Sequence, residues 1–439
     1  MKKYNLIVVG GGLTGVAAAV AAARQNLSVL LVEQGGYLGG AMTNGLIYPF
    51  MRFWTELDNG ETKWLSAGLF TEMRNRCYAY LEGATPAKPA EGPSFAHFNV
   101  SNGPGDFNTE YFKYALDDMV EDAGVDVLYH ASLFKVNSEG RNLKSILVAV
   151  KSGEMELEAD FFVDATGDGD LMAFAGCDFQ LGREKDSLSQ PMTTCFRMAN
   201  VDDSLLNAQT MREIQDAYKQ KKEAGTIKNP REDVLTFRGK AMGKGIVHFN
   251  TTRIVKHDPT NPLDVSKAEA MARKQIWEML CFLKEGGFPA FKDAFIVNSA
   301  TNIGVRESRK LKGEHVLTAQ ELIDLTRFED SIALGDYDID IHNPEGTGTS
   351  HRYFKPGEYY TIPYRSLLPK EFDNLLVGGR CMSATHEAQA SIRIMPICAT
   401  TGEAAGTAIG VAYNSGTNTH TVDVKAVQAK LRENGAAID

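Results

Sequence analysis

The sequence predicts an α/β protein in which a Rossmann-like nucleotide-binding domain carries an inserted, smaller α+β domain. Three observations support this fold class. An apolar run at 3–9 leads into a glycine-rich turn and a helix of small residues at 16–24. A second strand-like run, 27–32, ends on an acidic residue. Much later, the runs 160–164 and 374–377 also enter glycine turns, as further strands of the same sheet would.

The first turn has the spacing of a dinucleotide-binding fingerprint. Gly10, Gly12 and Gly15 form G-x-G-x-x-G, and Glu33 follows 18 positions after the third glycine. Gly10 permits a tight turn, Gly12 lets a diphosphate approach the backbone, and Gly15 lets the helix lie close to the sheet. The positive helix N-terminus suits a diphosphate. Glu33 can accept hydrogen bonds from both ribose hydroxyls and disfavours a 2′-phosphate, so FAD or NAD fits and NADP does not.

The composition excludes several other classes of protein. The 439 residues carry a net charge of −10, which argues against a nucleic-acid or anionic-membrane partner. No apolar stretch reaches the roughly 18 residues that a membrane helix needs. The six cysteines show neither metal-ligand nor secretory spacing, so we expect no metal site and a reducing cytoplasm.

The chain divides into three predicted segments. Residues 1–185 would form the first part of the nucleotide-binding domain, with an excursion at about 45–107. Residues 186–360 would form the inserted substrate domain, and 361–439 would supply the return segment and the C-terminal helices. Within the first segment, three short strand-like runs between 133 and 157 predict a meander.

Two helices can be predicted in detail. Asn108 can cap a helix over 109–123 that has apolar residues on one face. The final long helix carries Gly402, Gly406 and Gly410 at i, i+4 and i+8. Such a stripe of small residues allows close packing, which we expect to be against a sheet or a cofactor.

These motifs together resemble those of the glutathione-reductase-type flavoproteins and, within them, the FAD-dependent oxidoreductase family. The resemblance covers nearly the whole chain and rests on the fingerprint with Glu33 and on the segments 163–170, 304–309, 375–380 and 393–406. It implies an FAD-binding domain built of a parallel sheet and a three-stranded meander. It also implies an enzyme that transfers a hydride to or from flavin N5, acting on a small organic substrate, with carboxylates among the candidates.

The resemblance assigns FAD contacts to several regions. The turn at 165–168 would lie against the pyrophosphate and ribose, Leu133 would meet the adenine edge, and the helix start near 399–402 would face the flavin. There the helix dipole would stabilise negative charge on reduction. The predicted cofactor-binding residues are Gly10, Gly12, Leu13, Thr14, Gly15, Glu33, Gln34, Gly39, Gly40, Ala41, Leu133, Ala165, Thr166, Gly167, Asp168, Gly379, Arg380, Ala399, Thr400 and Gly402.

The sequence departs from the two-nucleotide reductases of this group. It lacks a second G-x-G-x-x-G for a nicotinamide and a redox-active C-x-x-x-x-C. The electron donor is therefore expected to be a substrate in the inserted domain. No histidine lies in the loop 35–43, so we expect FAD to be noncovalent.

Four residues are candidates for the chemistry. Arg306 and Arg309, either side of Glu307, could clamp a carboxylate, or could belong to a salt-bridge cluster joining the two domains. His386 is the first choice for an acid/base group, although a packed or capping histidine is the alternative. Arg393 could lie close to the flavin or form a structural ion pair.

Two other functions stay open at this point. An NAD-linked dehydrogenase could use the same fingerprint, and a non-catalytic flavin-binding protein could share the whole pattern. The sequence leaves the substrate, the reaction direction and the oligomeric state undetermined.

Overall fold

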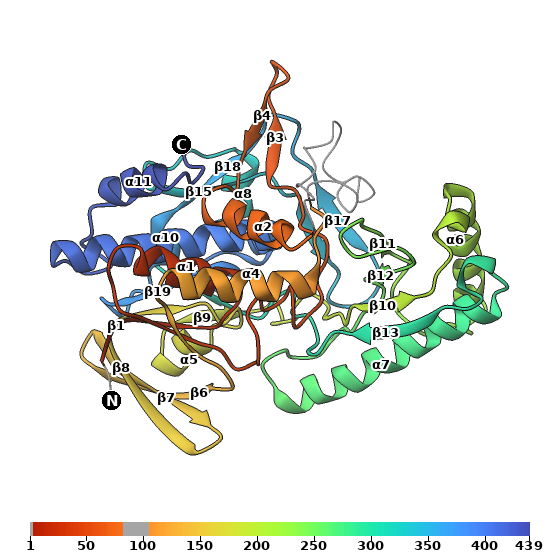
Figure 1. Ribbon diagram of the computed structural model, residues 1–439, viewed down its shortest axis with the longest axis horizontal. Helices are drawn as coiled ribbons and strands as arrows, with labels where there is room; N and C mark the ends of the chain where they lie inside the picture. The colour runs from red at the N-terminus through yellow and green to blue at the C-terminus, as the bar shows by residue number, and fades with distance from the viewer. Residues whose placement is uncertain (1–2, 82–104) are drawn as a thin grey trace.

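The protein is described by a computed structural model that covers residues 3–81 and 105–439. Its largest sheet has the strand order β5-β2-β1-β8-β7-β6 (Figure 1). Strand β19 pairs with the last residues of β8, on the edge opposite β1. The strands of its parallel part are β1 (Tyr4–Val9), β2 (Val29–Val32), β5 (Asp126–Leu128), β8 (Gly153–Asp164) and β19 (Leu375–Val377).

The carboxyl ends of these strands meet at one edge of the sheet. Val9 at the end of β1 lies beside Val32 of β2 and Asp164 of β8, and Asp164 in turn lies beside Val377 of β19. Ligands of open parallel sheets bind at such an edge, where consecutive connections leave on opposite faces. The glycine turns that follow β1, β8 and β19 are therefore brought together by strand register alone.

The antiparallel part of the sheet is the predicted meander, made of β6 (Ser132–Glu139), β7 (Asn142–Val150) and the first half of β8. The sequence suggested a short third meander strand and a separate parallel strand. The structure corrects this, because β8 runs unbroken from Gly153 to Asp164 and pairs with β7 first and with β1 afterwards. No glycine or proline interrupts residues 154–164, so nothing in the chain ends the strand between the two pairings.

Helix α1 (Leu13–Ala23) is buried between the sheet and α10 (Met395–Ser415), and its alanine and valine side chains leave room for both neighbours. A Cβ atom at Gly402 would overlap the carbonyl oxygen of Thr14, and one at Gly406 would overlap that of Ala18. The glycine stripe therefore packs against a helix. The expected partner, a sheet or a cofactor, was wrong, because Gly402 and Gly406 lie against the backbone of α1 and a Cβ atom at Gly410 would meet the side chain of Gln25, just beyond the end of α1.

A second sheet with its own apolar core lies to the right in Figure 1. It has the order β11-β12-β10-β13 and is flanked by two helices. Its elements are β10 (Phe196–Ala199), α6 (Ala208–Glu223), β11 (Thr236–Phe237), β12 (Val247–Phe249), α7 (Pro262–Glu285) and β13 (Phe295–Ser299).

After β13 the chain returns toward the first domain in three small antiparallel pairs. They are β14 (Arg309–Leu311) with β9 (Phe179–Leu181), β15 (Ser331–Gly335) with β18 (Tyr360–Pro363), and β16 (Ile339–His342) with β17 (Thr349–Arg352). The domain limits at 185 and 360 stay a prediction, since residues near both limits pair with other parts of the chain.

The remaining elements are distributed over both parts of the molecule. Asn108 caps α4 as predicted, accepting hydrogen bonds from the N–H groups of Glu110 and Tyr111. Residues 82–104 of the predicted excursion lie outside the described residues. The other elements are β3 (Trp54–Glu56), β4 (Thr62–Trp64), α2 (Leu69–Ala79), α4 (Thr109–Asp122), α5 (Asp170–Ala175), η1 (Asp203–Leu205), η2 (Pro289–Phe291), α8 (Ala319–Ile323), η3 (Tyr364–Leu367), η4 (Gly379–Cys381), α9 (His386–Ile392) and α11 (Val424–Glu433). Within the described ranges no helix is both long and apolar enough to cross a bilayer.

Candidate nucleotide and substrate site

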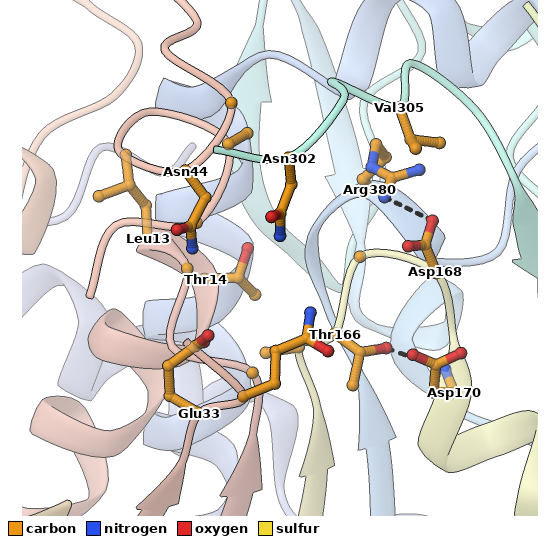
Figure 2. Close-up of a pocket in the computed structure, with 18 of the residues that line it drawn as sticks. Leu13, Thr14, Glu33, Asn44, Thr166, Asp168, Asp170, Asn302, Val305 and Arg380 are labelled. Carbon is orange, nitrogen blue, oxygen red and sulfur yellow. Dashed lines mark hydrogen bonds and ion pairs between the residues drawn. The ribbon is translucent and has the colours of Figure 1, made fainter. Parts of the chain in front are cut away.

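One cavity of about 250 Å³ lies at the carboxyl edge of the main sheet, and Figure 2 shows many of its side chains. Residues from five separate parts of the chain enclose it. Its lining comprises Val9, Gly10, Gly12, Leu13, Thr14, Val32, Glu33, Gln34, Gly39, Gly40, Ala41, Asn44, Gly45, Ala131, Ser132, Leu133, Ala165, Thr166, Gly167, Asp168, Asp170, Asn302, Ile303, Gly304, Val305, Arg380, Arg393, Met395 and Cys398.

The first helix opens onto this cavity at its N-terminus. Gly12 is the N-cap of α1, and no side chain caps the helix there. A Cβ atom at Gly12 would meet only Gly40 Cα, at 3.9 Å. By contrast, a Cβ atom at Gly10 or Gly15 would overlap backbone, and Gly15 does not line the cavity. Gly12 therefore leaves free space at a positive helix end, which fits a diphosphate.

Glu33 holds the glycine turn in place while facing the cavity. Its Oε2 accepts a hydrogen bond of 2.7 Å from the N–H of Gly11, and its Oε1 accepts one of 2.6 Å from the N–H of Gly35. Each carboxylate oxygen has a second lone pair, so Glu33 can still accept from ribose hydroxyls. Only 5% of the residue is exposed, and Figure 2 places it on the same side as Thr14.

The opposite wall is an ion-pair network around Asp168. Its Oδ1 accepts a hydrogen bond from Arg380 at 2.7 Å (Figure 2). The same oxygen accepts one from the hydroxyl of Ser308 at 2.6 Å. Arg309 donates to the Asp168 carbonyl at 3.0 Å and to Asp170 Oδ1 at 2.8 Å. The wall is thus rigid and its charges are largely compensated.

The far end of the cavity lies at the N-terminus of α10. The N-cap Ile394 offers no side-chain cap, and Met395 and Cys398 of the first turns line the cavity. A second positive helix end therefore faces the same space as that of α1. Residues 302–305, which follow β13 of the second sheet, approach from the other side, and Figure 2 shows Asn302 and Val305 there.

The structure brings most of the predicted cofactor residues to this cavity. Those that line it are Gly10, Gly12, Leu13, Thr14, Glu33, Gln34, Gly39, Gly40, Ala41, Leu133, Ala165, Thr166, Gly167, Asp168 and Arg380. Those that do not are Gly15, Gly379, Ala399, Thr400 and Gly402. The last three lie in α10 beyond its open end, which is formed by Met395 and Cys398 instead.

The four predicted catalytic residues lie in four different environments. Only Arg393 lines the cavity. Arg306 and Arg309 are separated, because an i, i+3 spacing brings side chains together on a helix and no helix spans these residues. Arg309 opens β14 and binds the Asp168 wall, whereas Arg306 donates to the Pro191 carbonyl at 2.6 Å.

His386 lies in a buried ion network. Its Nδ1 is 2.8 Å from both carboxylate oxygens of Glu307, and the ammonium of Lys310 is 2.5 Å from Oε1 of the same group. Burial alone would raise the pKa of Glu307, but the hydrogen bond to His386 and the charge of Lys310 hold it below its usual range. This geometry favours the packed alternative for His386.

Several lining residues were not predicted from the sequence. Asn302 and Ile303 directly precede the 304–309 segment, and Gly304 and Val305 begin it, but none of the four was predicted to have a role in binding. Met395 and Cys398 lie between predicted residues and could have been found by extending the helix start. Across the described ranges, no group of three or more histidine, cysteine or acidic side chains could hold a metal ion.

The fold and this cavity define a dinucleotide-binding protein of the Rossmann type, in which a second segment, near the C-terminal part of the chain, also lines the cavity. The sequence matches the profile of the family described as FAD dependent oxidoreductase over residues 5–431. The chain therefore belongs to that family and is an FAD-dependent oxidoreductase, with FAD as its cofactor. This membership sets aside the NAD-linked and the non-catalytic alternatives.

Three solved structures with similar chain traces are distant in sequence. A geranylgeranyl bacteriochlorophyll reductase-like protein of Thermoplasma acidophilum is 13% identical, with a TM-score of 0.46 over 99% of this chain and 83% of its own. The anhydrotetracycline hydroxylase OxyS of Streptomyces rimosus is 12% identical, with a TM-score of 0.48 over 99% of this chain and 66% of its own. The p-nitrophenol 4-monooxygenase PnpA of Pseudomonas putida DLL-E4 is 8% identical, with a TM-score of 0.47 over 99% of this chain and 85% of its own.

No substrate or reaction is transferred from these proteins, because the TM-scores do not exceed 0.48. For several other matched structures the chain spans only 54–66% of their length. No curated protein matches the sequence closely enough to count as a relative. The family assignment therefore rests on the profile match.

Proposed function

We propose that this enzyme transfers a hydride between flavin N5 and a small organic substrate held at the Arg393 end of the cavity. The observation that supports this is the composition of that end. Arg393, Met395 and Cys398 come from the return segment, whereas residues 302–305 follow a strand of the second sheet. A substrate there would lie between the cofactor-binding sheet and the second sheet, as expected for an inserted substrate domain.

The residues of this chain would bind, orient and stabilise, while bound FAD supplies the hydride acceptor or donor. The α1 end and Glu33 would hold the diphosphate and the ribose. The open N-terminus of α10 and the guanidinium of Arg393 would stabilise negative charge that develops beside them on reduction. Because the end of α10 already faces the cavity, the protein would not have to move to stabilise this charge.

A carboxylate is the substrate class that the neighbouring cations favour. Arg393 lines the cavity, and Arg306 directly follows the lining residue Val305. Guanidinium groups bind carboxylates through two parallel hydrogen bonds, which fixes the orientation of the substrate as well as its charge. Arg309 would not bind the substrate, since it already pairs with Asp168 and Asp170.

We also propose, within the wider family, a cofactor domain of the glutathione-reductase type. The support is the combination of the parallel strands with the meander β6–β7–β8 on the same sheet. A reducing compartment such as the cytoplasm is supported by the six cysteines, all of which carry free thiols.

The decisive experiment is anaerobic flavin reduction by a panel of hydroxy acids, amino acids, alcohols and amines. A substrate of the proposed reaction should bleach the flavin without added nicotinamide. Deuterium at its reacting carbon should slow the bleaching by a primary isotope effect. Flavin reduction only by NADH or NADPH, followed by oxygen-dependent hydroxylation, would contradict hydride transfer from the substrate.

A further inference from the structure

Four arginines gather behind the substrate end of the cavity. They are Arg231 from the loop before β11, Arg253 after β12, Arg306 before β14 and Arg393 after α9. Burial lowers the pKa of Arg306 to about 9, and the charges of the other three arginines add to this effect. The other three guanidinium groups are therefore close enough for their charges to act on Arg306.

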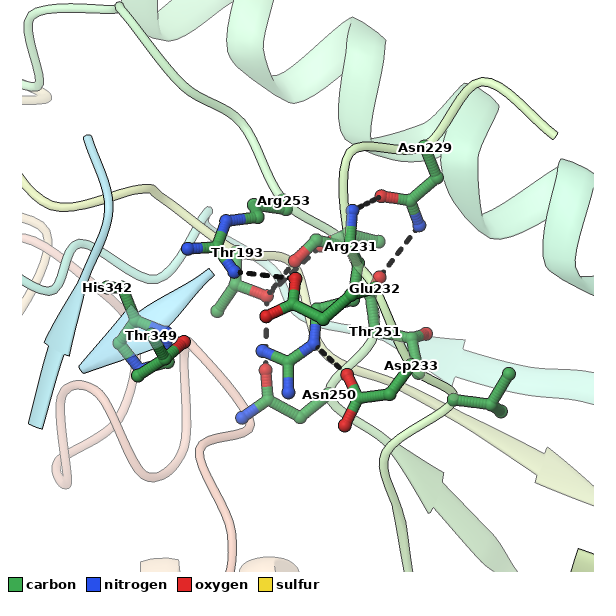
Figure 3. A network of polar contacts seen from close by, with 12 residues as sticks. Thr193, Asn229, Arg231, Glu232, Asp233, Asn250, Thr251, Arg253, His342 and Thr349 are labelled. Atoms are coloured by element: carbon green, nitrogen blue, oxygen red, sulfur yellow. Dashed lines mark hydrogen bonds and ion pairs between the residues drawn. The ribbon is translucent and has the colours of Figure 1, made fainter. Parts of the chain in front are cut away.

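Three of these arginines each have a carboxylate partner. Arg231 pairs with Asp233 at 2.5 Å and Arg253 pairs with Glu232 at 3.2 Å, as Figure 3 shows. The third, Arg393, pairs with Asp340 at 3.3 Å. A buried charge is tolerated when a counter-charge lies beside it, so these three pairs are close to neutral.

The neighbouring acidic and histidine side chains do not change this balance. Asp338 pairs with His351 at 3.4 Å, and this hydrogen bond raises the pKa of His351. Burial lowers the pKa of His342 to about 3, which makes it neutral. Its ring nitrogens face Asp340 at 3.3 Å and the hydroxyl of Thr349 at 3.1 Å.

Arg306 is the exception. In the part of the chain that the structure describes, its guanidinium has no carboxylate within ion-pair distance. Its contacts are the Pro191 carbonyl at 2.6 Å and the amide oxygen of Asn250 at 3.5 Å. The residue is half-buried. One positive charge is thus left uncompensated among groups that are otherwise paired.

The position of Arg306 links this charge to the cavity. Val305 and Gly304 line the cavity, and Gly304 forms a β-bridge with Thr193. The amide oxygen of Asn250 that Arg306 contacts also lies 3.2 Å from the hydroxyl of Thr193. Figure 3 shows the side chains of Thr193 and Asn250 side by side. Arg306, Thr193 and Asn250 do not line the cavity themselves, but Arg306 follows the lining residue Val305 and Thr193 bridges to the lining residue Gly304.

We propose that Arg306 binds the single carboxylate of a monoanionic substrate, with Thr193 and Asn250 beside it. This inference rests on the proposed function and specifies its substrate. A carboxylate carries the one negative charge that the cluster lacks, and its two oxygens match the guanidinium fork. A dicarboxylate or a phosphate dianion would add a further negative charge near Asp340, where no free cation remains among the described residues.

The test uses the FAD-loaded enzyme and follows the change in flavin absorbance on titration with small ligands. Acetate and glycolate represent monocarboxylates, succinate represents dicarboxylates, acetamide is the neutral analogue, and chloride is the simple anion. Glycolate or acetate should perturb the spectrum and saturate. Succinate and acetamide should bind more weakly by roughly tenfold or more.

The matched variants are Arg306→Gln, Arg306→Lys and, as a control, Arg273→Gln on the exposed face of α7. Arg306→Gln should weaken glycolate binding by roughly tenfold or more, Arg306→Lys by less, and Arg273→Gln not at all. Retained FAD absorbance shows that a variant is folded, and the Lys variant serves if the Gln variant fails to fold. Equal glycolate affinity in folded Arg306→Gln, or equal displacement of glycolate by chloride, would overturn the assignment.

The two proposals fail in different ways. Hydride transfer from a neutral substrate, with no carboxylate bound at Arg306, would overturn the carboxylate assignment and leave the proposed function intact. Monocarboxylates that bind through Arg306 but never exchange a hydride would overturn the proposed function alone.

Discussion

The hydroxyl of Thr14 donates a 3.0 Å hydrogen bond to the backbone carbonyl of Cys398, which lies 384 residues later in the chain. Both residues line the cavity. The bond joins the first turn of α1 to the first turns of α10, so the two open helix ends are fixed relative to each other. The diphosphate end and the flavin end of the predicted FAD site are therefore held relative to each other by this bond together with the close packing of α1 on α10.

The stability of this contact should depend on Gly402. The Gly402→Ala variant places a methyl group where the carbonyl of Thr14 lies, so α1 and α10 must move apart. Overpacking of this kind costs about 1–3 kcal/mol. We expect urea unfolding to show a loss in that range, and FAD affinity to fall as well. The control is Gly346→Ala, whose Cβ would meet nothing within 4 Å. Equal stabilities for the two variants would contradict the packing argument.

The fingerprint glycines should separate binding from folding. At Gly12 the backbone has φ −69°, and a Cβ would enter open space in the cavity. The Gly12→Ala variant should keep the melting temperature of the FAD-free protein but bind FAD weaker by roughly tenfold or more. Gly15→Ala should instead lower that melting temperature, since its Cβ would overlap the Gly10 carbonyl. Fluorescence quenching on FAD titration measures the affinity for FAD. Unchanged affinity in Gly12→Ala would show that the diphosphate does not bind beside Gly12.

The parts predicted best from the sequence are those fixed by local pattern. The strand–turn–helix with Glu33, the meander and the cap at Asn108 each depend on a few consecutive residues, and the structure contains them all. The glycine stripe of α10 could be read as a packing surface, but its partner is set by tertiary arrangement. A sequence gives no direct signal for that.

The substrate end was the least predictable part. Arg306 and Arg309 look like a pair in the sequence, yet the extended backbone sends them to Pro191 and to Asp168. The lining role of residues 302–305 depends on the bridge between Gly304 and Thr193, a contact across more than a hundred residues. Only the assembled second sheet shows which side of this segment faces the cavity.

A buried acid on α10 should make stability depend on pH. Glu403 is 1% exposed, and burial raises its pKa from 4.5 to about 8. Between about pH 5 and pH 8 the folded protein keeps a proton that the unfolded chain releases, so stability should fall as pH rises, by up to about 1.4 kcal/mol per pH unit. Glu403→Gln has no ionisable group at this position, so its stability should lack this dependence on pH.

The measurement is the difference in unfolding free energy between wild type and Glu403→Gln across that pH range. The advantage of the variant should grow with pH and level off above pH 8. Glu433→Gln, at an exposed position on α11, is the control and should show no such trend. A difference that stays constant with pH would mean that Glu403 is already ionised in the folded protein.

The network of Lys310, Glu307 and His386 should act on stability more than on chemistry. Lys310 and Glu307 are fully buried, and none of the three lines the cavity. Glu307→Gln leaves the Lys310 ammonium without its counter-charge, and breaking a buried pair in this way costs about 3–5 kcal/mol. His386→Asn removes a weaker partner and should cost less, because Lys310 still pairs with Glu307. In folded His386→Asn, the rate of anaerobic flavin reduction by a substrate should stay within about threefold of wild type, whereas loss of a general acid or base slows a reaction by roughly 10²-fold or more. A loss of that size, with a changed pH profile and unchanged FAD affinity, would show that His386 is the acid/base group after all.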